Sequence, residues 1–298
     1  MLGAAWIAGR AVIPAIEASR NGRLVSIASR DPGRARELAS THSFARVAES
    51  YDAVLEDREV DAVYIPLVNS LHRQWTLRAL AAGKHVLCEK PLAMNAVEAE
   101  EMAAAAEQSG LHLMEAFMYR FHPRTRGVVE SVRDPLYVAA TFGFTIRDVA
   151  NYRMRASLGG GALLDVGCYV VNVARWILGE PDQLSATSRL DASREDGVDM
   201  TVAALLHFPA GAAASVWASF ESPEEQELVI VEHERTHRLD KPFTAGRDPD
   251  DPYQLMVESF GDSVIDNRLV AIPPAESVAN MRVLDRIRAT AEAPALSR

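Results

Sequence analysis

Apolar runs alternate with segments of helical polar–apolar periodicity through residues 1–121. The helical pattern recurs between the runs and is closed by glycine at Gly83 and Gly110, as helix ends often are. Continuous apolar runs are typical of strands that are buried on both faces of a parallel sheet. The repeated β-α-β order therefore predicts an α/β fold of the Rossmann type, a doubly wound parallel sheet with helices on both faces. The expected strands cover residues 23–30, 60–67, 84–91 and 111–118.

The pattern changes after residue 121, where β-rich segments follow one another with few helices between them. Such a run predicts an α+β domain with an open, mainly antiparallel sheet. We therefore expect two domains, residues 1–121 and residues 122–298. The expected strands of the second domain cover residues 136–146, 182–190, 199–208, 212–220 and 227–232. Its expected helices cover residues 123–132, 161–178, 252–266 and 275–291.

The opening "MLGAAWIAGR" has the spacing of a phosphate-binding turn, with Gly3, Ala5 and Ala8 where G-x-G-x-x-G is usual. A helix over residues 10–18 follows, and its N-terminus would face a pyrophosphate. A strand normally precedes this turn, yet only Met1 and Leu2 stand there. Either the chain is a truncation of a longer one, or another segment fills the place. We favour truncation, because the fingerprint matches best when further residues are assumed before Met1.

Composition narrows the class of protein. The net charge is −10, from 41 acidic and 31 basic residues, which disfavours a nucleic-acid surface. The apolar runs are shorter than a membrane span, and the histidines form no close metal-ligand pattern. Cys88 and Cys168 lie in apolar runs, so we expect buried thiols and not a disulfide. We expect a cytoplasmic protein with no membrane, nucleic-acid or metal partner.

Candidate cofactor residues stand at the expected strand ends. Ser29 and Arg30 occupy the place where an acidic residue usually selects NAD, and an arginine there favours NADP, with NAD still possible. Asp31 is expected to cap the next helix, and the role of Arg34 stays open. Asn69 and His72 follow the strand at 60–67, where they could bind phosphate or ribose, or could serve as a helix cap and an exposed first-turn histidine.

Candidate catalytic residues occupy two further positions. Lys90 ends a strand before Pro91 and could reach a substrate hydroxyl, or it could be a surface lysine in a turn. Asp165 and Tyr169 follow a triple glycine at helical i, i+4 spacing, so they share a face. Tyr169 could exchange a proton while Asp165 orients it or a sugar hydroxyl; alternatively, Asp165 caps the helix and Tyr169 packs.

Together these stretches resemble the glucose–fructose oxidoreductase, inositol dehydrogenase and MocA family over nearly the whole chain. The matching stretches are "GAAWIA", "ASRDPGRARELA", "VDAVYIPLVNSLH", "AAGKHVLCEKPLA", "MEAFMYRFHP" and "GGGALLDVGCYVVN". Tyr169 makes the chain look most like the branch of dimeric dihydrodiol dehydrogenases and NADP-dependent xylose dehydrogenases. The polar segment 231–240 departs from this family's pattern, and we interpret it as a surface loop.

The resemblance implies a function and a set of site residues. Lys90 and Tyr169 would be the catalytic pair, Asp165 would support the substrate, and the peptide before Pro91 would be cis. Asn151, Arg153 and Tyr253 would lie near the substrate. The expected cofactor-binding residues are Gly3, Ala4, Ala5, Trp6, Ile7, Ser29, Arg30, Pro66, Leu67, Asn69, His72, Glu89, Lys90, Pro91, Met118 and Arg120.

The implied reaction is hydride transfer between a nicotinamide and a carbinol carbon of a pyranose sugar or a cyclic vicinal diol. The implied assembly is a homodimer formed through the sheet of the second domain. The alternative is a weakly active or inactive cofactor-binding member of the family, because the first Rossmann strand is missing.

Overall fold

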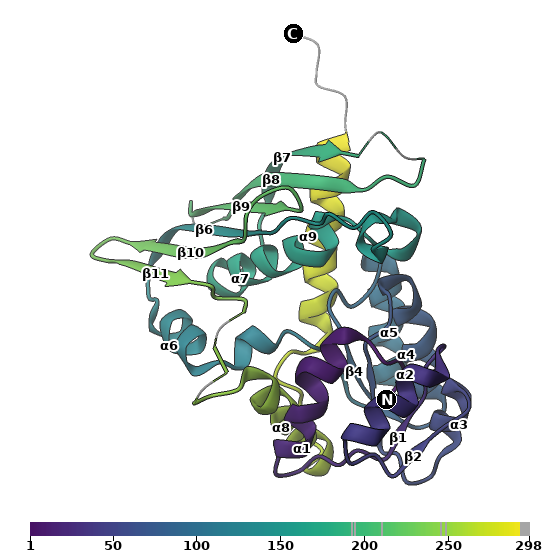
Figure 1. The fold of residues 1–298 in the computed structure, drawn as a ribbon. Helices are drawn as coiled ribbons and strands as arrows, with labels where there is room; N and C mark the ends of the chain where they lie inside the picture. The colour runs from purple at the N-terminus through teal and green to yellow at the C-terminus, as the bar shows by residue number, and fades with distance from the viewer. Residues whose placement is uncertain (192, 194, 210, 245, 248, 293–298) are drawn as a thin grey trace. The chain divides into compact units, whose positions relative to one another are not determined.

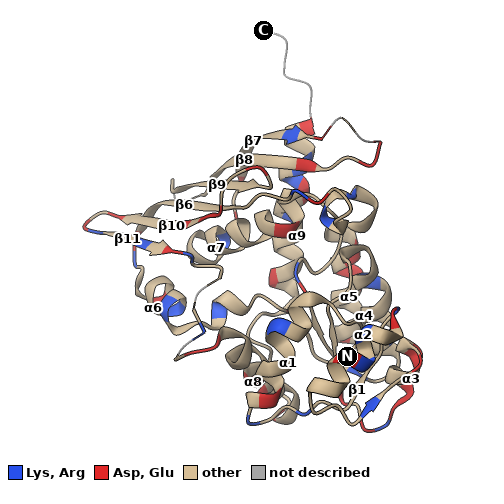
Figure 2. Ribbon diagram, in the orientation of Figure 1, with Lys and Arg blue, Asp and Glu red and all other residues tan. Residues whose placement is uncertain are grey.

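The computed structural model describes residues 1–191, 193, 195–209, 211–244, 246–247 and 249–292, and these divide into two compact units (Figure 1). The first unit contains Met1–Ala93, Val97–His122 and Gly246–Val278. The second contains Met94–Ala96, Pro123–Ala245 and Ala279–Arg298. Basic and acidic residues are interspersed along the ribbon of both units (Figure 2).

The first unit is built on parallel strands. One pair consists of β1 (Ser26–Ile27) and β2 (Arg46–Val47). A second group, in the order β3-β4-β5, consists of Ala62–Ile65, His85–Cys88 and Leu113–Glu115. Their apolar side chains are almost all buried, as expected for strands covered on both faces. The predicted Rossmann-type parallel sheet is confirmed.

Residues 1–3 lie between these two groups of strands. The main-chain nitrogen of Leu2 donates to Tyr64 O at 3.0 Å, on the β3 side. On the β1 side, Gly3 N donates to Ala28 O at 2.8 Å, and Ala28 N donates to Met1 O at 3.1 Å. The place of the expected first strand is therefore occupied by this short segment, which carries hydrogen bonds to both neighbours.

Local capping signals explain where several helices of the first unit begin. Asp31 accepts a hydrogen bond from Gly33 N ahead of α2 (Pro32–Thr41), which confirms the predicted cap. The Ser50 side chain likewise accepts a hydrogen bond from Ala53 N and caps α3 (Tyr51–Glu56). The remaining helices before residue 122 are η1 (Ala8–Val12), α1 (Ile13–Ala18), η2 (Asn69–Leu71), α4 (His72–Ala81), α5 (Ala96–Ser109) and η3 (Met118–Phe121).

Helix α8 (Pro252–Ile265) also belongs to the first unit, although the sequence analysis assigned it to the second domain. It packs against α1 and η3. Arg20 forms ion pairs with Asp262 and Glu258, and Asn21 Nδ2 donates to Glu258 O at 2.9 Å. These contacts join segments far apart in the sequence, which is why local periodicity does not reveal them.

The second unit contains a six-stranded sheet in the order β11-β10-β6-β9-β8-β7 (Figure 1). Neighbouring strands are antiparallel except β6 and β9, which are parallel. This confirms the predicted, mainly antiparallel sheet. The strands are β6 (Pro135–Gly143), β7 (Gln183–Leu190), β8 (Asp199–His207), β9 (Ala213–Ser219), β10 (Glu225–Glu232) and β11 (Thr236–Asp240).

Residues 231–240 lie mostly at the surface, as expected, but they form a strand hairpin and not a loop. Strand β10 continues to Glu232, and β11 returns beside it, with Leu228 opposite Leu239. The turn is held by the Glu232 carboxylate, which accepts hydrogen bonds from Arg133 N at 2.7 Å and from Arg235 Nε at 2.6 Å. The segment is polar because β11 is an edge strand, where charged side chains limit unwanted strand pairing.

One face of this sheet is covered by helix α7 (Cys168–Leu178), which contacts β6 and β9. The segment Ala156–Leu178 is the one stretch of the described chain long and apolar enough to cross a membrane, and 83% of its apolar window is buried in the fold. This is the burial of a core helix. The other helices that follow residue 122 are α6 (Pro123–Ser131), η4 (Tyr152–Met154), η5 (Ala156–Leu158), the π-helical turn η6 (Leu163–Gly167) and α9 (Pro274–Glu292).

Candidate active site

The turn at Gly3 has the backbone of a dinucleotide cradle. Gly3 has φ +112°, which favours glycine, and a Cβ there would lie 2.9 Å from Leu67 Cδ2. Ala4 is buried, Ala5 is half-buried, and the helix that starts directly afterwards includes the exposed Trp6 and the half-buried Ile7. Free amides at such a helix start attract phosphate. The residues present therefore fit a dinucleotide, although their contacts with one stay a prediction.

The end of β1 carries an arginine with no ion-pair partner in the described chain. Arg30 is exposed there. Ser29 is half-buried, and its Oγ accepts a hydrogen bond from Asp31 N at 3.2 Å. Asp31 Oδ1 accepts a hydrogen bond from Gly33 N at 2.9 Å and caps α2. An exposed guanidinium at this position suits a 2′-phosphate.

His72 is not the exposed histidine of the alternative interpretation, and its role toward a cofactor stays a prediction. Its side chain is fully buried, with Nδ1 2.9 Å from Pro91 O and Nε2 2.9 Å from Leu67 O. Burial lowers the pKa of His72, although the two carbonyl groups oppose that shift. His72 thus connects the loop after β3 to the loop after β4. Asn69, one turn earlier, is buried as well.

Lys90 is half-buried at the carboxyl end of β4, and the predicted cis peptide before Pro91 is confirmed. Next to it, Tyr64 Oη donates to Glu89 Oε1 at 2.5 Å. Burial and the Glu89 carboxylate raise the pKa of Tyr64 well above its usual value. The same two causes raise the pKa of Tyr253, while the positive charge of Lys90 opposes the shift. Tyr253 therefore lies within electrostatic range of both Glu89 and Lys90.

The expected residues around this loop occupy differing environments. Pro66 and Pro91 are buried, Leu67 is half-buried, and Met118 is 4% exposed. Arg120 forms an ion pair with Glu276. Their contacts with a cofactor stay predictions.

In the second unit, Asp165 and Tyr169 lie in the helical segment formed by η6 and α7. Arg153 Nε donates to Asp165 Oδ2 at 2.7 Å, and the Asp165 side chain is 7% exposed. Burial disfavours the charged form of Arg153, but the charges of Asp165, Tyr152 and Tyr169 more than compensate and raise its pKa. The ring of Tyr169 is held by Phe142 and Phe243, each with its ring centroid 5.5 Å away.

The glycines before this segment are required by close backbone contacts. A Cβ on Gly160 would lie 2.3 Å from Arg153 O. Gly161 N donates to that same carbonyl group at 2.9 Å, and Gly161 has φ +109°. The "GGG" stretch thereby fixes Arg153 beside Asp165. Asn151 accepts a hydrogen bond from Arg153 N at 3.1 Å and orders the same loop.

Sequence reasoning missed three residues that shape these sites. Tyr64 and Phe142 were counted only as parts of the expected strands at 60–67 and 136–146, and Phe243 fell in no expected element. A tyrosine within a buried strand is a usable signal, because a buried hydroxyl needs a partner. The partnership of Phe142 and Phe243 with Tyr169 depends on strand pairing and has no local signal.

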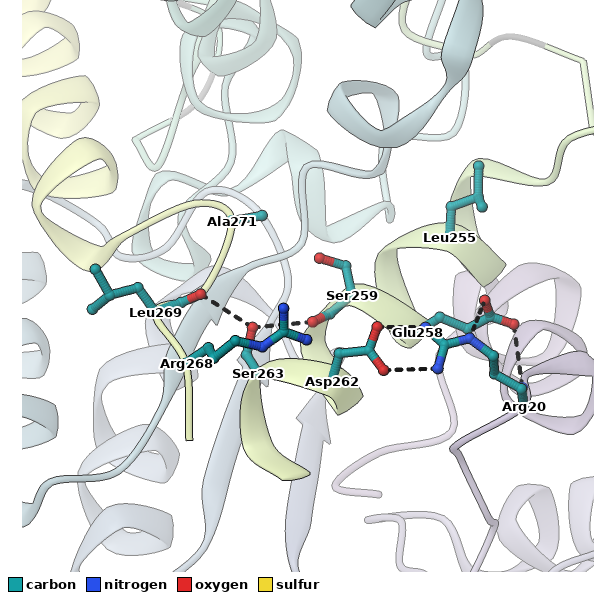
Figure 3. A pocket seen from close by; sticks show the side chains of 9 residues that line it. All are labelled: Arg20, Leu255, Glu258, Ser259, Asp262, Ser263, Arg268, Leu269 and Ala271. Atoms are coloured by element: carbon teal, nitrogen blue, oxygen red, sulfur yellow. Dashed lines mark hydrogen bonds and ion pairs between the residues drawn. The ribbon is translucent and has the colours of Figure 1, made fainter. Parts of the chain in front are cut away.

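A separate surface pocket in the first unit is shown in Figure 3. Its charged groups are already engaged, since Arg20 pairs with Asp262 and Glu258, and Arg268 pairs with Asp266. None of the sequence-predicted site residues lines it. We therefore do not assign it to the reaction.

Comparisons with known proteins find matches to both units of the chain. The model of the Gfo/Idh/MocA oxidoreductase family, NAD-binding Rossmann fold, matches residues 1–117, and that of the Gfo/Idh/MocA C-terminal domain matches residues 132–236. A D-xylose 1-dehydrogenase (NADP⁺) from Haloferax volcanii is 38% identical over 98% of this chain and 96% of its own. A trans-1,2-dihydrobenzene-1,2-diol dehydrogenase from Sus scrofa is 38% identical over 67% of this chain and 61% of its own.

Solved structures agree with these matches. The 3-ketoreductase KijD10 from Actinomadura kijaniata, crystallised with NADP, superposes with a TM-score of 0.86 and 30% identity, over 97% of this chain and 96% of its own. The predicted oxidoreductase class and the predicted nicotinamide dinucleotide cofactor are confirmed at the level of the family. The chain belongs to the Gfo/Idh/MocA family of oxidoreductases.

Proposed function

We propose that this protein is an NADP(H)-dependent oxidoreductase acting on a carbinol carbon of a pyranose sugar or a cyclic vicinal diol. The observation that carries the proposal is the ion pair of the half-buried Arg153 with the buried Asp165 beside Tyr169. A tyrosine hydroxyl, a carboxylate and a guanidinium group together can bind neighbouring hydroxyl groups. The relatives named for xylose and for a dihydrodiol act on compounds of this kind.

The cofactor would be held at the Gly3 turn, and Arg30 would bind the 2′-phosphate that distinguishes NADP from NAD. A bound nicotinamide supplies the hydride chemistry. We assign to Tyr169 the transfer of the hydroxyl proton and to Lys90 the stabilisation of the developing alkoxide. Asp165 holds a substrate hydroxyl and is itself fixed by Arg153.

We also propose that two copies associate through the outer face of the six-stranded sheet. On this face Trp217 lies opposite Thr141 on one side and Ala203 on the other. Leu205, in the next row, is 38% exposed. Small and apolar residues in adjacent rows suit a dry interface. We further propose a cytoplasmic location, since the two cysteines are buried and form no disulfide in the described chain.

The test of the catalytic assignment uses Lys90→Met and Tyr169→Phe. Turnover is screened with NADP⁺ against aldoses and cyclic diols, and NADPH affinity is measured by fluorescence titration. We expect each variant to lose about 10²-fold or more in kcat, as is usual for a lost acid–base group. NADPH binding should survive within a few-fold.

Matched controls are Lys241→Met and Tyr51→Phe. Lys241 is exposed, and Tyr51 is half-buried in α3, where its ring contacts Trp75. Both controls should turn over like the wild type. Full turnover in Lys90→Met would refute the assignment. Tight NADPH binding without turnover of any substrate by the wild type would favour an inactive cofactor-binding member of the family.

A further inference from the structure

Strand β8 begins with a carboxylate that reaches the segment carrying Asp165 and Tyr169. Asp199 Oδ2 accepts a hydrogen bond from Leu163 N at 2.6 Å. Leu163 is the first residue of the π-helical turn η6, and the preceding residue, Ala162, makes no side-chain cap. The first amides of a helix lack acceptors within the helix. Asp199 therefore supplies the cap from a strand 36 positions away in the sequence.

The backbone next to this cap is shaped to admit the carboxylate. A Cβ on Gly161 would lie 2.2 Å from Asp199 Oδ1, so any side chain at residue 161 would exclude Asp199 from its position. Gly161 N donates to Arg153 O at 2.9 Å, and Asp165 N donates to Gly161 O at 3.0 Å. The Asp199 carboxylate, the glycine turn, Arg153 and Asp165 thus form one connected cluster.

The electrostatics of Asp199 agree with a specific function for this carboxylate. Burial raises its pKa to about 6, while the amides of Leu163 and Ala162 and the positive charge of Arg288 on α9 act in the opposite direction. A carboxylate kept at such a desolvation cost usually has a defined structural or functional task. Here the groups that stabilise it are chiefly the amides it caps.

We propose that Asp199 is a positioning residue for the oxidoreductase reaction, holding the start of η6 so that Asp165 and Tyr169 keep their places. The proposal rests on the proposed function, because it concerns the same two side chains. Asp199 itself touches the main chain of the segment and not the reacting groups. Small displacements of catalytic groups by such outer contacts can cost about 10²-fold in rate.

The test compares Asp199→Ala and Asp199→Asn with the control Asp196→Asn. Asp196 precedes the same strand, but its carboxylate accepts hydrogen bonds from Ser157 N at 2.9 Å and Ser157 Oγ at 2.7 Å, at η5 instead of η6. We measure kcat, KM, NADPH affinity and hydrogen exchange of the peptide spanning residues 160–169. Thermal unfolding verifies that each variant is folded.

We expect Asp199→Ala to lower kcat by about 10- to 100-fold and to speed exchange at Leu163, with NADPH affinity within about two-fold of the wild type. Asp199→Asn keeps an oxygen acceptor, so it should restore most of the kcat and the slow exchange. Asp196→Asn should resemble the wild type in both measurements.

Two results would overturn the inference. One is a folded Asp199→Ala protein with wild-type kcat. The other is unchanged exchange at Leu163, which would show that the cap does not hold the segment. A wild type that turns over no aldose or cyclic diol would instead contradict the proposed function. The exchange measurement keeps these two failures distinguishable.

Discussion

Replacing His72 by alanine separates two roles that the sequence alone left open. A cofactor ligand at this position would matter mainly for NADPH affinity. In the structure the imidazole is instead fully buried between Leu67 O and Pro91 O. The substitution should therefore weaken the fold of the first unit and have only a secondary effect on the cofactor.

The expected size of the loss follows from these contacts. A neutral imidazole donates through one nitrogen, so the variant leaves at least one buried carbonyl group unpaired, at a cost of about 1–3 kcal/mol. Removing a fully enclosed ring also leaves a cavity, and large-to-small substitutions cost about 2–5 kcal/mol. We expect a total loss of about 3–8 kcal/mol, which lowers the melting temperature by roughly 10–20 °C.

The assay combines thermal unfolding with NADPH titration, and His207→Ala serves as the control because His207 is exposed. Stability should also depend on pH. Because burial lowers the pKa of His72 below its usual 6.5, the unfolded chain binds the proton more readily. The wild type should lose stability as the pH falls below about 6.5, and His72→Ala should lose less of it.

A His72→Ala protein with wild-type melting temperature and NADPH affinity reduced more than ten-fold would refute this reasoning. It would restore the interpretation of His72 as a cofactor ligand. Equal stability losses in His72→Ala and His207→Ala would show that the assay does not report the buried contacts.

Three further predictions concern the cofactor turn and the sheet. Gly3→Ala should weaken NADPH binding at least ten-fold, because residue 3 has φ +112° and an added Cβ meets Leu67, and titration checks this. Arg30→Asp should weaken NADPH far more than NADH, and equal losses in the two titrations would refute the selector role of Arg30. Trp217→Asp should convert the proposed dimer to a monomer in analytical ultracentrifugation without loss of secondary structure by circular dichroism, since a charge on the sheet's outer face opposes association.

Elements with a strong local pattern were predictable from the sequence. The buried apolar runs predicted β3, β4 and β5, and Asp31 followed by proline predicted the start of α2. Short elements and edge strands could not be predicted in this way. Helix α3 has only 6 residues, and the exposed side chains of β11 carry no apolar signal. These two elements form because neighbouring segments supply their partners.

The candidate site shows the same division. The cis peptide before Pro91 followed from the family resemblance, and the helical placement of Tyr169 followed from the sequence pattern. The burial of His72 could not be predicted from the sequence. A histidine after a strand has the same sequence signature whether its ring faces a ligand or two carbonyl groups. The cap from Asp199 depends on β8 lying beside the glycine turn, and only the tertiary fold brings them together.

The parallel pairing of β6 with β9 has a consequence for how the chain folds during synthesis. Both partners of β6 come late, since β9 begins at Ala213 and β10 at Glu225. Until they leave the ribosome, β6 has two unpaired edges, and the apolar α7 that follows it has no sheet to cover. Long-range pairing of this kind is slow and exposes nascent chains to aggregation. We therefore expect folding of the second unit to limit the yield of folded protein. The yield should depend on chaperones and on temperature for this reason, even when the first unit folds efficiently.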